Sequence, residues 1–192
     1  MGQRLNIEIL DNGETLANSY YHWSAYTGSA IELTKQILEQ IDDLRRNNKL
    51  GWAVSLLECT GAGVNEEERM RIDSDKTHRF DGLAFNDAIN RNEGLLSVTS
   101  EGIEETRTWE EGRVEIDIST RKIMFSVLFD MSESDYDENY REDGEEELPT
   151  ILEKEMADFL EIPFDRFDEF SDFVDKYPHG VRLSDCVLMW IE

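Results

Sequence analysis

The chain has 192 residues, with 44 Asp and Glu against 19 Lys and Arg, and therefore a formal net charge of -25. This charge repels phosphate groups, and the densest basic stretch is only Arg45-Arg46 followed by Lys49, so direct binding to nucleic acid or to an anionic membrane surface is not expected. Hydrophobic residues make up 39% of the chain and include four Trp, six Tyr and nine Phe, which excludes a wholly disordered acidic protein.

The first third of the chain predicts a β-hairpin followed by two helices. In residues 3–22, apolar and polar residues alternate on both sides of an Asp-Asn-Gly turn at 11–13. Residues 28–44 place apolar side chains at helical spacing, and a second, more buried helix is expected over 50–59. Further short helices are expected near 66–72 and 83–89.

The middle of the chain returns to the two-residue periodicity of strands. Strands are expected over residues 95–99, 113–118 and 122–129, with a tight turn at 119–121. Joined to the N-terminal hairpin, they predict an antiparallel sheet packed against amphipathic helices. We therefore expect a single α+β domain over residues 1–192.

Acidic residues are concentrated in the C-terminal third. Residues 133–147 contain nine acids and one base, which predicts a solvated, flexible loop. One or two acidic helices are expected over 151–160 and 164–177, and a closing strand over 181–191. In the second helix, aromatic residues spaced three apart belong in the core, while the acids face solvent. These aromatic residues are Phe164, Phe167, Phe170 and Phe173.

Four aromatic residues, a histidine and a serine crowd residues 20–26, at the end of the second predicted strand. Strand alternation places Tyr20, His22 and Ser24 on one face, where His22 could act as a general base in a hydrolase or nuclease. The stretch could instead bind a protein, or simply be a packed strand end with a hydrogen-bonded histidine. The contact residues of a protein-binding surface would be Tyr21, Trp23 and Tyr26.

No motif in the sequence predicts a metal, a cofactor or an assigned catalytic residue. The acids at 73–75 and 135–146 begin like calcium loops, but each loop lacks the required glycine. Glu115 and Asp117 alternate with apolar residues, so they are expected on a solvated strand face and not in a two-metal nuclease site. No run of about 18 apolar residues is present, and a cytoplasmic location is expected.

In its acidic run at 133–147 and its acidic segment at 153–175, the chain resembles small acidic proteins of phages and plasmids, including type II anti-CRISPR proteins. Several proteins of that class are DNA mimics that occupy a nucleic-acid groove of a host nuclease. The resemblance lies in the composition of the C-terminal third. It implies an inhibitor that acts in the cytoplasm of a bacterial host cell.

The leading hypothesis from the sequence is a non-enzymatic protein that binds and inhibits a basic, nucleic-acid-binding partner protein. Carboxylates on a surface can imitate backbone phosphates and pair with the Arg and Lys that normally hold the duplex. Two alternatives are a hydrolase or nuclease with a pocket around His22, and an accessory protein whose acidity serves solubility only. The expected partner-binding residues are Asp135, Asp137, Glu138, Glu142, Asp143, Glu145, Glu146 and Glu147.

Overall fold

The computed structural model of the chain describes residues 4–22, 24–25, 27–63, 94–108, 110–127 and 160–176. Several predicted segments lie outside these ranges. They are the short helices near 66–72 and 83–89, the acidic run at 133–147, the helix expected over 151–160 apart from its last residue, and the strand over 181–191.

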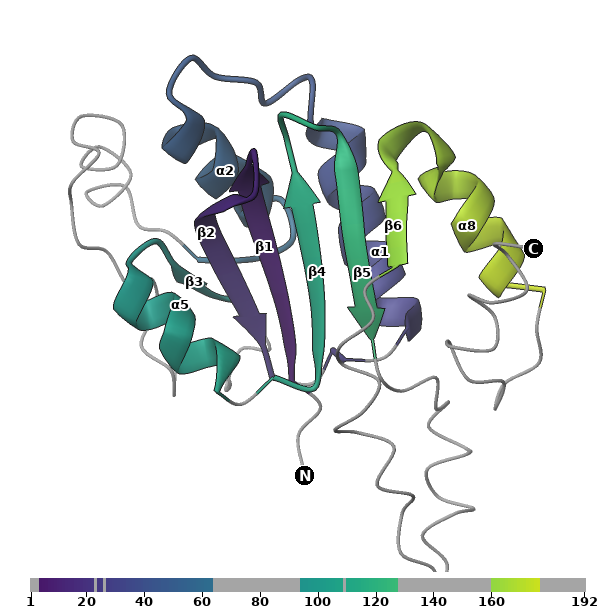
Figure 1. The fold of residues 1–192 in the computed structure, drawn as a ribbon, viewed down its shortest axis with the longest axis horizontal. Coiled ribbons are helices and arrows are strands. Elements are labelled where there is room, and N and C mark those ends of the chain that lie inside the picture. The colour runs from purple at the N-terminus through teal and green to yellow at the C-terminus, as the bar shows by residue number, and fades with distance from the viewer. Residues whose placement is uncertain are drawn as a thin grey trace, which may run out of the picture.

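Within the described residues, six strands form one sheet in the order β3-β2-β1-β4-β5-β6 (Figure 1). Helices pack on both faces of this sheet, so the α+β class is confirmed. The strands are β1 (Leu5–Asp11), β2 (Glu14–Tyr21), β3 (Leu95–Ser97), β4 (Gly112–Asp117), β5 (Lys122–Val127) and β6 (Leu160–Pro163).

Strands β1 and β2 form the predicted hairpin, joined by Asn12 and Gly13. The φ angles of these two residues are 52° and 82°, and a two-residue type I′ turn requires positive values at both positions. The Asp117 carboxylate accepts hydrogen bonds from their backbone N–H groups at 3.2 and 2.8 Å, and from those of Ser119 and Thr120 at 2.9 and 3.0 Å. Partial burial acts to raise the pKa of Asp117, but these four donors outweigh it and lower the pKa. Asp117 thus ties the β1–β2 turn to the β4–β5 turn.

The sheet is mixed, because β1 and β4 are parallel while the other neighbouring strands are antiparallel. The sequence predicted antiparallel pairing throughout. The difference arises from helix α5 (Ser100–Arg107), which the sequence did not predict and which follows a strand ending at Ser97 instead of at residue 99. Parallel strands need a crossover connection, usually a helix. Helix α5 carries the chain from β3 across β2 and β1 to β4 (Figure 1).

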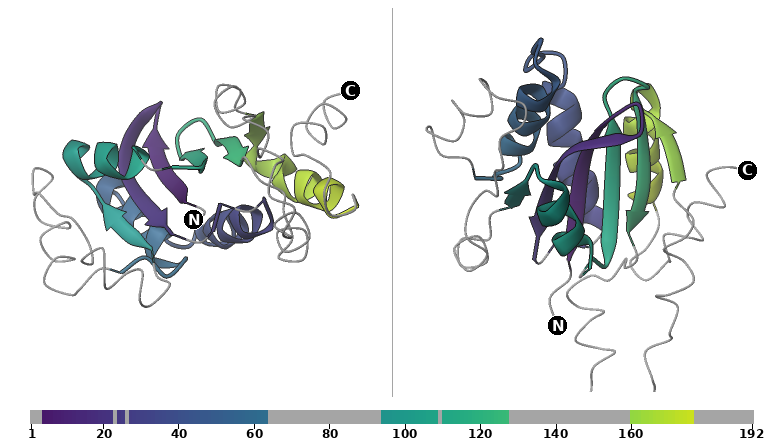
Figure 2. Two further views of the ribbon diagram at one scale, coloured as in Figure 1. Left: turned by 90° about the horizontal axis from the view of Figure 1, so that it is seen from below. Right: turned by 60° about the vertical axis from the view of Figure 1, so that its left-hand side comes forward.

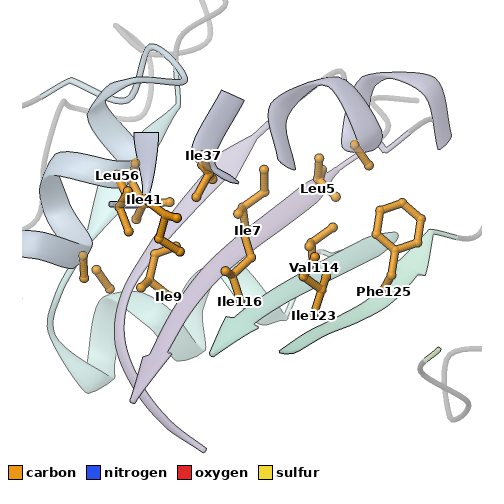
Figure 3. Packing of buried hydrophobic residues seen from close by; sticks show 14 of the residues in the cluster. Leu5, Ile7, Ile9, Ile37, Ile41, Leu56, Val114, Ile116, Ile123 and Phe125 are labelled. Atoms are coloured by element: carbon orange, nitrogen blue, oxygen red, sulfur yellow. The ribbon is translucent and has the colours of Figure 1, made fainter. Parts of the chain in front are cut away.

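The opposite face of the sheet packs on helices α1 (Thr27–Gln40) and α2 (Lys49–Glu58) and forms the apolar core (Figure 2). Helix α1 ends four residues earlier than predicted, in a turn. Leu5, Ile7 and Ile9 of β1 are fully buried, and each such side chain contributes about 1.5–3 kcal/mol to stability. Figure 3 shows side chains of β1, β4 and β5 directed towards the two helices. The labelled side chains that face the sheet from the helical layer are Ile37 of α1, Ile41 in the turn after α1, and Leu56 of α2.

Helix α8 (Phe167–Val174), preceded by a short 3-10 helix (Phe164–Arg166), packs on the same face as α1. Phe167 and Phe170 are buried against Phe125 of β5, with ring centroids 6.2 and 5.5 Å apart. Phe164 and Phe173 are half-buried. The predicted core position of the aromatic stripe is therefore confirmed for its two inner members. The expected helix over 164–177 is shorter than predicted, and β6, just before it, was not predicted.

Replacing Gly94 with Ala tests how closely β3 approaches β2. A Cβ atom at Gly94 would meet Ser19 Oγ and would lie 2.8 and 2.9 Å from ring carbons of Tyr21. We expect Gly94→Ala to lower the free energy of unfolding by about 1–3 kcal/mol, as overpacking does. The matched control is Gly28→Ala in the first turn of α1, where nothing lies within 4 Å and no loss is expected. Equal urea midpoints for the two variants would contradict the close approach.

Candidate functional site

The face of the sheet beneath α5 is both polar and buried. Asn6 and Glu8 alternate with the core residues of β1 and are 0% exposed, because α5 covers them. Buried polar groups need hydrogen-bond partners. Here most of them find partners in β2, α5 and the segment that leads into β4, whereas Asn18 Oδ1 is buried without one among the described residues. We refer to these residues together as the polar layer. They are Asn6, Glu8, Thr15, Asn18, Thr106, Arg107, Glu110 and Arg113.

An ion pair between Glu8 and Arg107 joins α5 to the centre of the sheet. Arg107 Nε donates to Glu8 Oε1 at 2.7 Å and Arg107 Nη2 donates to Glu8 Oε2 at 2.6 Å, which is the two-bond geometry preferred between guanidinium and carboxylate. Thr15 Oγ1 adds a third hydrogen bond to Glu8 at 3.0 Å. The bonds to Glu8 raise the pKa of Arg107. Because Glu8 is wholly buried, removing Arg107 would leave a buried carboxylate without its cationic partner.

Asparagine side chains extend the polar layer from β2 to β4. Asn18 Nδ2 donates to Asn6 Oδ1 at 3.0 Å and to Thr106 Oγ1 at 2.7 Å. Asn6 Nδ2 in turn donates to Glu110 Oε2 at 2.8 Å. Arg113 Nε lies 3.0 Å from both oxygens of Glu110. The hydrogen bonds therefore form a continuous chain from the second strand, through the first, to the fourth.

This chain of contacts leaves the buried carboxylates fully engaged. Both oxygens of Glu8 and both oxygens of Glu110 accept hydrogen bonds from groups within the layer. A general base must be within reach of a substrate proton, and the oxygens of these two carboxylates are instead hydrogen-bonded to neighbouring side chains. The polar layer therefore serves to hold α5 on the sheet.

Two residues of the alternative catalytic pocket do meet. The hydroxyl of Tyr20 lies 2.9 Å from His22 Nδ1, as strand alternation predicts. Burial lowers the pKa of His22, helped by the positive charge of Arg4, and burial raises the pKa of Tyr20.

The Cys59 thiol, a nucleophile of another kind, is poorly suited to catalysis. Burial raises its pKa to about 11, so this thiol is protonated at neutral pH and a poor nucleophile.

Ser24, the third predicted member of that pocket, lies in a different place. Strand β2 ends at Tyr21, so the alternation that would align Ser24 with His22 stops before it. Ser24 instead lines an open polar hollow of about 190 Å³ together with Tyr21 and Thr60. The other lining residues are Ser29, Glu32, Leu33 and Gln36.

Tyr21, a predicted partner-contact residue, supports the fold from within. It is 5% exposed, its hydroxyl hydrogen bonds to Thr60 Oγ1, and burial raises its pKa to about 12. Little of its surface is therefore available to a partner. Trp23 and Tyr26, the other two predicted contact residues, lie outside the described residues.

The exposed charges of α8 and its flanks are predominantly negative. Residues 160–176 carry six acids and two bases, all of them exposed, whereas residues 29–49 around α1 carry four of each. One base, Arg166, is paired with Glu169 at 2.9 Å. Four aspartates recur every three or four residues and so share one side of the helix. We call these the acidic face of α8, namely Asp165, Asp168, Asp172 and Asp175.

Sequence reasoning identified none of the polar layer as a site. The alternation in β1 predicts only that Asn6 and Glu8 face away from the apolar core. The sequence does contain one signal for the start of α5, which covers this layer. Thr99 is a favoured N-cap residue, and its hydroxyl accepts a hydrogen bond from the Gly102 N–H.

The expected partner-binding acids of 133–147 lie outside the described residues. Glu115 and Asp117, expected on a solvated face, are half-buried.

Comparisons with protein families, with curated proteins and with solved structures find no match to this chain. Among the residues that the structure describes, no group of three or more His, Cys, Asp or Glu side chains is placed to hold a metal ion. In the same part of the chain, no helix combines the length and the apolar character needed to cross a membrane.

Removing Arg107 tests whether the ion pair holds α5. Arg107→Met leaves the Glu8 charge buried without its partner, and we expect a loss of about 3–5 kcal/mol in the free energy of unfolding. The double variant Glu8→Met/Arg107→Met should recover a large part of that loss, because no unpaired charge is then buried. Glu104→Gln is the control, since Glu104 is 69% exposed and its pairing with Arg107 is worth at most about 1 kcal/mol. Equal stability of Arg107→Met and Glu104→Gln in urea unfolding would contradict the assignment.

Proposed function

We propose that the chain is a non-enzymatic binding protein that engages a basic partner protein through its acidic surface and thereby inhibits it. The observation that supports this proposal is the acidic face of α8. The aromatic side of the helix is buried in the core, and the opposite side presents carboxylates to solvent. The charges therefore stand on a rigid element and not on a loop.

Rigid spacing matters because complementary charges give specificity and fast association more than they give affinity. The α8 side chains Phe167 and Phe170 anchor the helix against Phe125. The acidic face thus needs little ordering when a partner binds, which limits the entropic cost of association. The negative electrostatic field of these carboxylates also accelerates the encounter with a positively charged partner surface, most strongly at low ionic strength.

A protein that binds nucleic acid is the partner class with the matching surface. Such proteins hold phosphate groups with clustered Arg and Lys, and carboxylates can pair with the same side chains. Occupation of a nucleic-acid groove would exclude the natural ligand, so binding by itself would inhibit the partner. In this proposal the acidic run at 133–147 adds further negative charge to the same interaction.

A hydrolase or nuclease centred on His22 is the second candidate, and the contact between Tyr20 and His22 favours it. A lowered pKa favours the neutral form of the His22 imidazole, which is the form that a general base requires. A nucleophile must also lie beside the base. Ser24, which was expected to fill that role, lines the hollow with Tyr21.

Neutralising the acidic face tests the proposed function. The tagged chain is first used to capture partners from a bacterial lysate at low and at high salt, and a basic nucleic-acid-binding protein is expected at low salt only. We then expect Asp165→Asn/Asp168→Asn/Asp172→Asn/Asp175→Asn to weaken binding of that protein about tenfold or more, since each exposed ion pair is worth about 0.2–1 kcal/mol. Its affinity should also depend less steeply on salt.

The matched control neutralises the same number of exposed acids around α1, where acids and bases balance. It is Glu32→Gln/Glu39→Gln/Asp42→Asn/Asp43→Asn, and its affinity for the partner should stay close to that of the parent chain. A third variant neutralises Asp135, Asp137, Glu142, Asp143 and Glu145 to Glu147 together, and it should also bind more weakly. Equal binding by all of these variants would show that the acids serve solubility only.

Substituting His22 separates the binding protein from the enzyme. His22→Ala should retain partner binding and inhibition if circular dichroism shows that it remains folded, because His22 lies apart from the acidic face in sequence and in fold. Hydrolysis of nucleic acid or ester substrates by the parent chain, abolished in the folded variant, would decide for the enzyme instead.

A further inference from the structure

The β1–β2 turn holds an Asn-Gly pair between two carboxylates. Asn12 and Gly13 are both exposed at the tip of the hairpin. The Gly13 N–H donates to Asp117 Oδ2 at 2.8 Å, and Asn12 Nδ2 donates to Asp11 Oδ1 at 3.1 Å. Asp11 is itself fixed by the Lys49 ammonium and the Ser119 hydroxyl.

Asn-Gly is the dipeptide that loses its side-chain amide most readily, because glycine offers no side chain to hinder ring closure. The Gly13 nitrogen gives up its proton to solvent and attacks Asn12 Cγ, and the new N–Cγ bond closes a succinimide. The Cγ–Nδ2 bond breaks, and the nitrogen takes up a proton from water and leaves as ammonia. Water then opens either side of the ring, giving aspartate or isoaspartate. The net change is hydrolysis, and no oxidant or reductant is needed.

Both reacting groups of this pathway are held in the folded hairpin. The attacking nitrogen is the Gly13 N–H, whose proton points at the negative charge of Asp117. Removing that proton would place a second negative charge beside the carboxylate, which is unfavourable. The hydrogen bond to Asp11 also restrains the amide group that must rotate for attack.

We propose that Asn12 is a deamidation site and that the Asp117 carboxylate protects it by holding the Gly13 N–H. Deamidation at this position then accompanies any local opening of the hairpin tip. The product carries a new carboxylate between Asp11 and Asp117, where like charges repel. Isoaspartate also adds a backbone carbon to the turn, which disturbs the pairing of Asp11 with Glu14. The modification is therefore expected to be irreversible damage to the hairpin, independent of the proposed binding function.

The experiment compares deamidation rates of folded chains at slightly alkaline pH by peptide mapping with mass spectrometry, separating aspartate from isoaspartate by chromatography. Asp117→Ala should deamidate at Asn12 on the order of tenfold faster than the parent chain, the factor that corresponds to one hydrogen bond to a charged group. Thr120→Ala is the control, because the contact of Thr120 with Asp117 is made by its backbone N–H, which the substitution keeps, and its rate should match that of the parent. Equal rates in Asp117→Ala and the parent would overturn the proposal.

A second measurement guards against general unfolding of the Asp117→Ala variant. The parent chain is incubated in native buffer and in a denaturing concentration of urea, and Asn12 should be lost much more slowly in the native buffer. The deamidation rates of the other Asn residues in folded Asp117→Ala should equal those in the parent chain. If native and unfolded parent chains deamidate at the same rate, the turn gives no protection and the inference is wrong.

Discussion

The arrangement of the sheet depends on the ion pair between Glu8 and Arg107. Arg107, the last residue of α5, reaches Glu8 on β1, and the chain passes from β3 to β4 through this helix. Glu8 is wholly buried, so its charge is tolerable only while Arg107 stays in place. The parallel pairing of β1 with β4 follows from the docking of α5, and β5, β6 and α8 are added to the sheet beyond that pair.

Elements with strong local signals were predictable from the sequence, and the crossover was not. The hairpin, α1 and the strands β4 and β5 show clear apolar periodicity, and α2 is a continuous, largely apolar run. Helix α5 turns Thr106 and Arg107 towards the sheet, with Ile103 as its main apolar contact, so the periodicity that indicates an amphipathic helix is missing. Because α5 was missed, the direction of β4 relative to β1 could not be predicted. Strand β6, only four residues long, gives too short a pattern to recognise.

In the candidate site too, contacts between residues close in sequence could be predicted, whereas contacts between distant residues could not. Strand alternation correctly predicted that Tyr20 and His22 lie together. It did not predict the position of Ser24, because the sequence does not show that β2 ends at Tyr21. Composition showed that the chain is acidic, yet not that some of its acids are buried in ion pairs while others face solvent. Inside the protein, Glu8 pairs with the distant Arg107 and Glu110 pairs with the neighbouring Arg113, whereas the aspartates of α8 face solvent.

The parallel pairing of β1 with β4 also sets the order in which the chain can fold during synthesis. Leu5 pairs with Gly112, a separation of 107 residues, so at about 5–20 residues per second β1 waits roughly 5–20 s for its partner. Until then β1 has a sheet neighbour on one side only, and its other edge is unpaired. Asn6 and Glu8 keep one face of this early hairpin hydrophilic, which disfavours pairing with other nascent chains. The polar groups that end up buried beneath α5 thus also limit the apolar surface of the chain before β4 has been made.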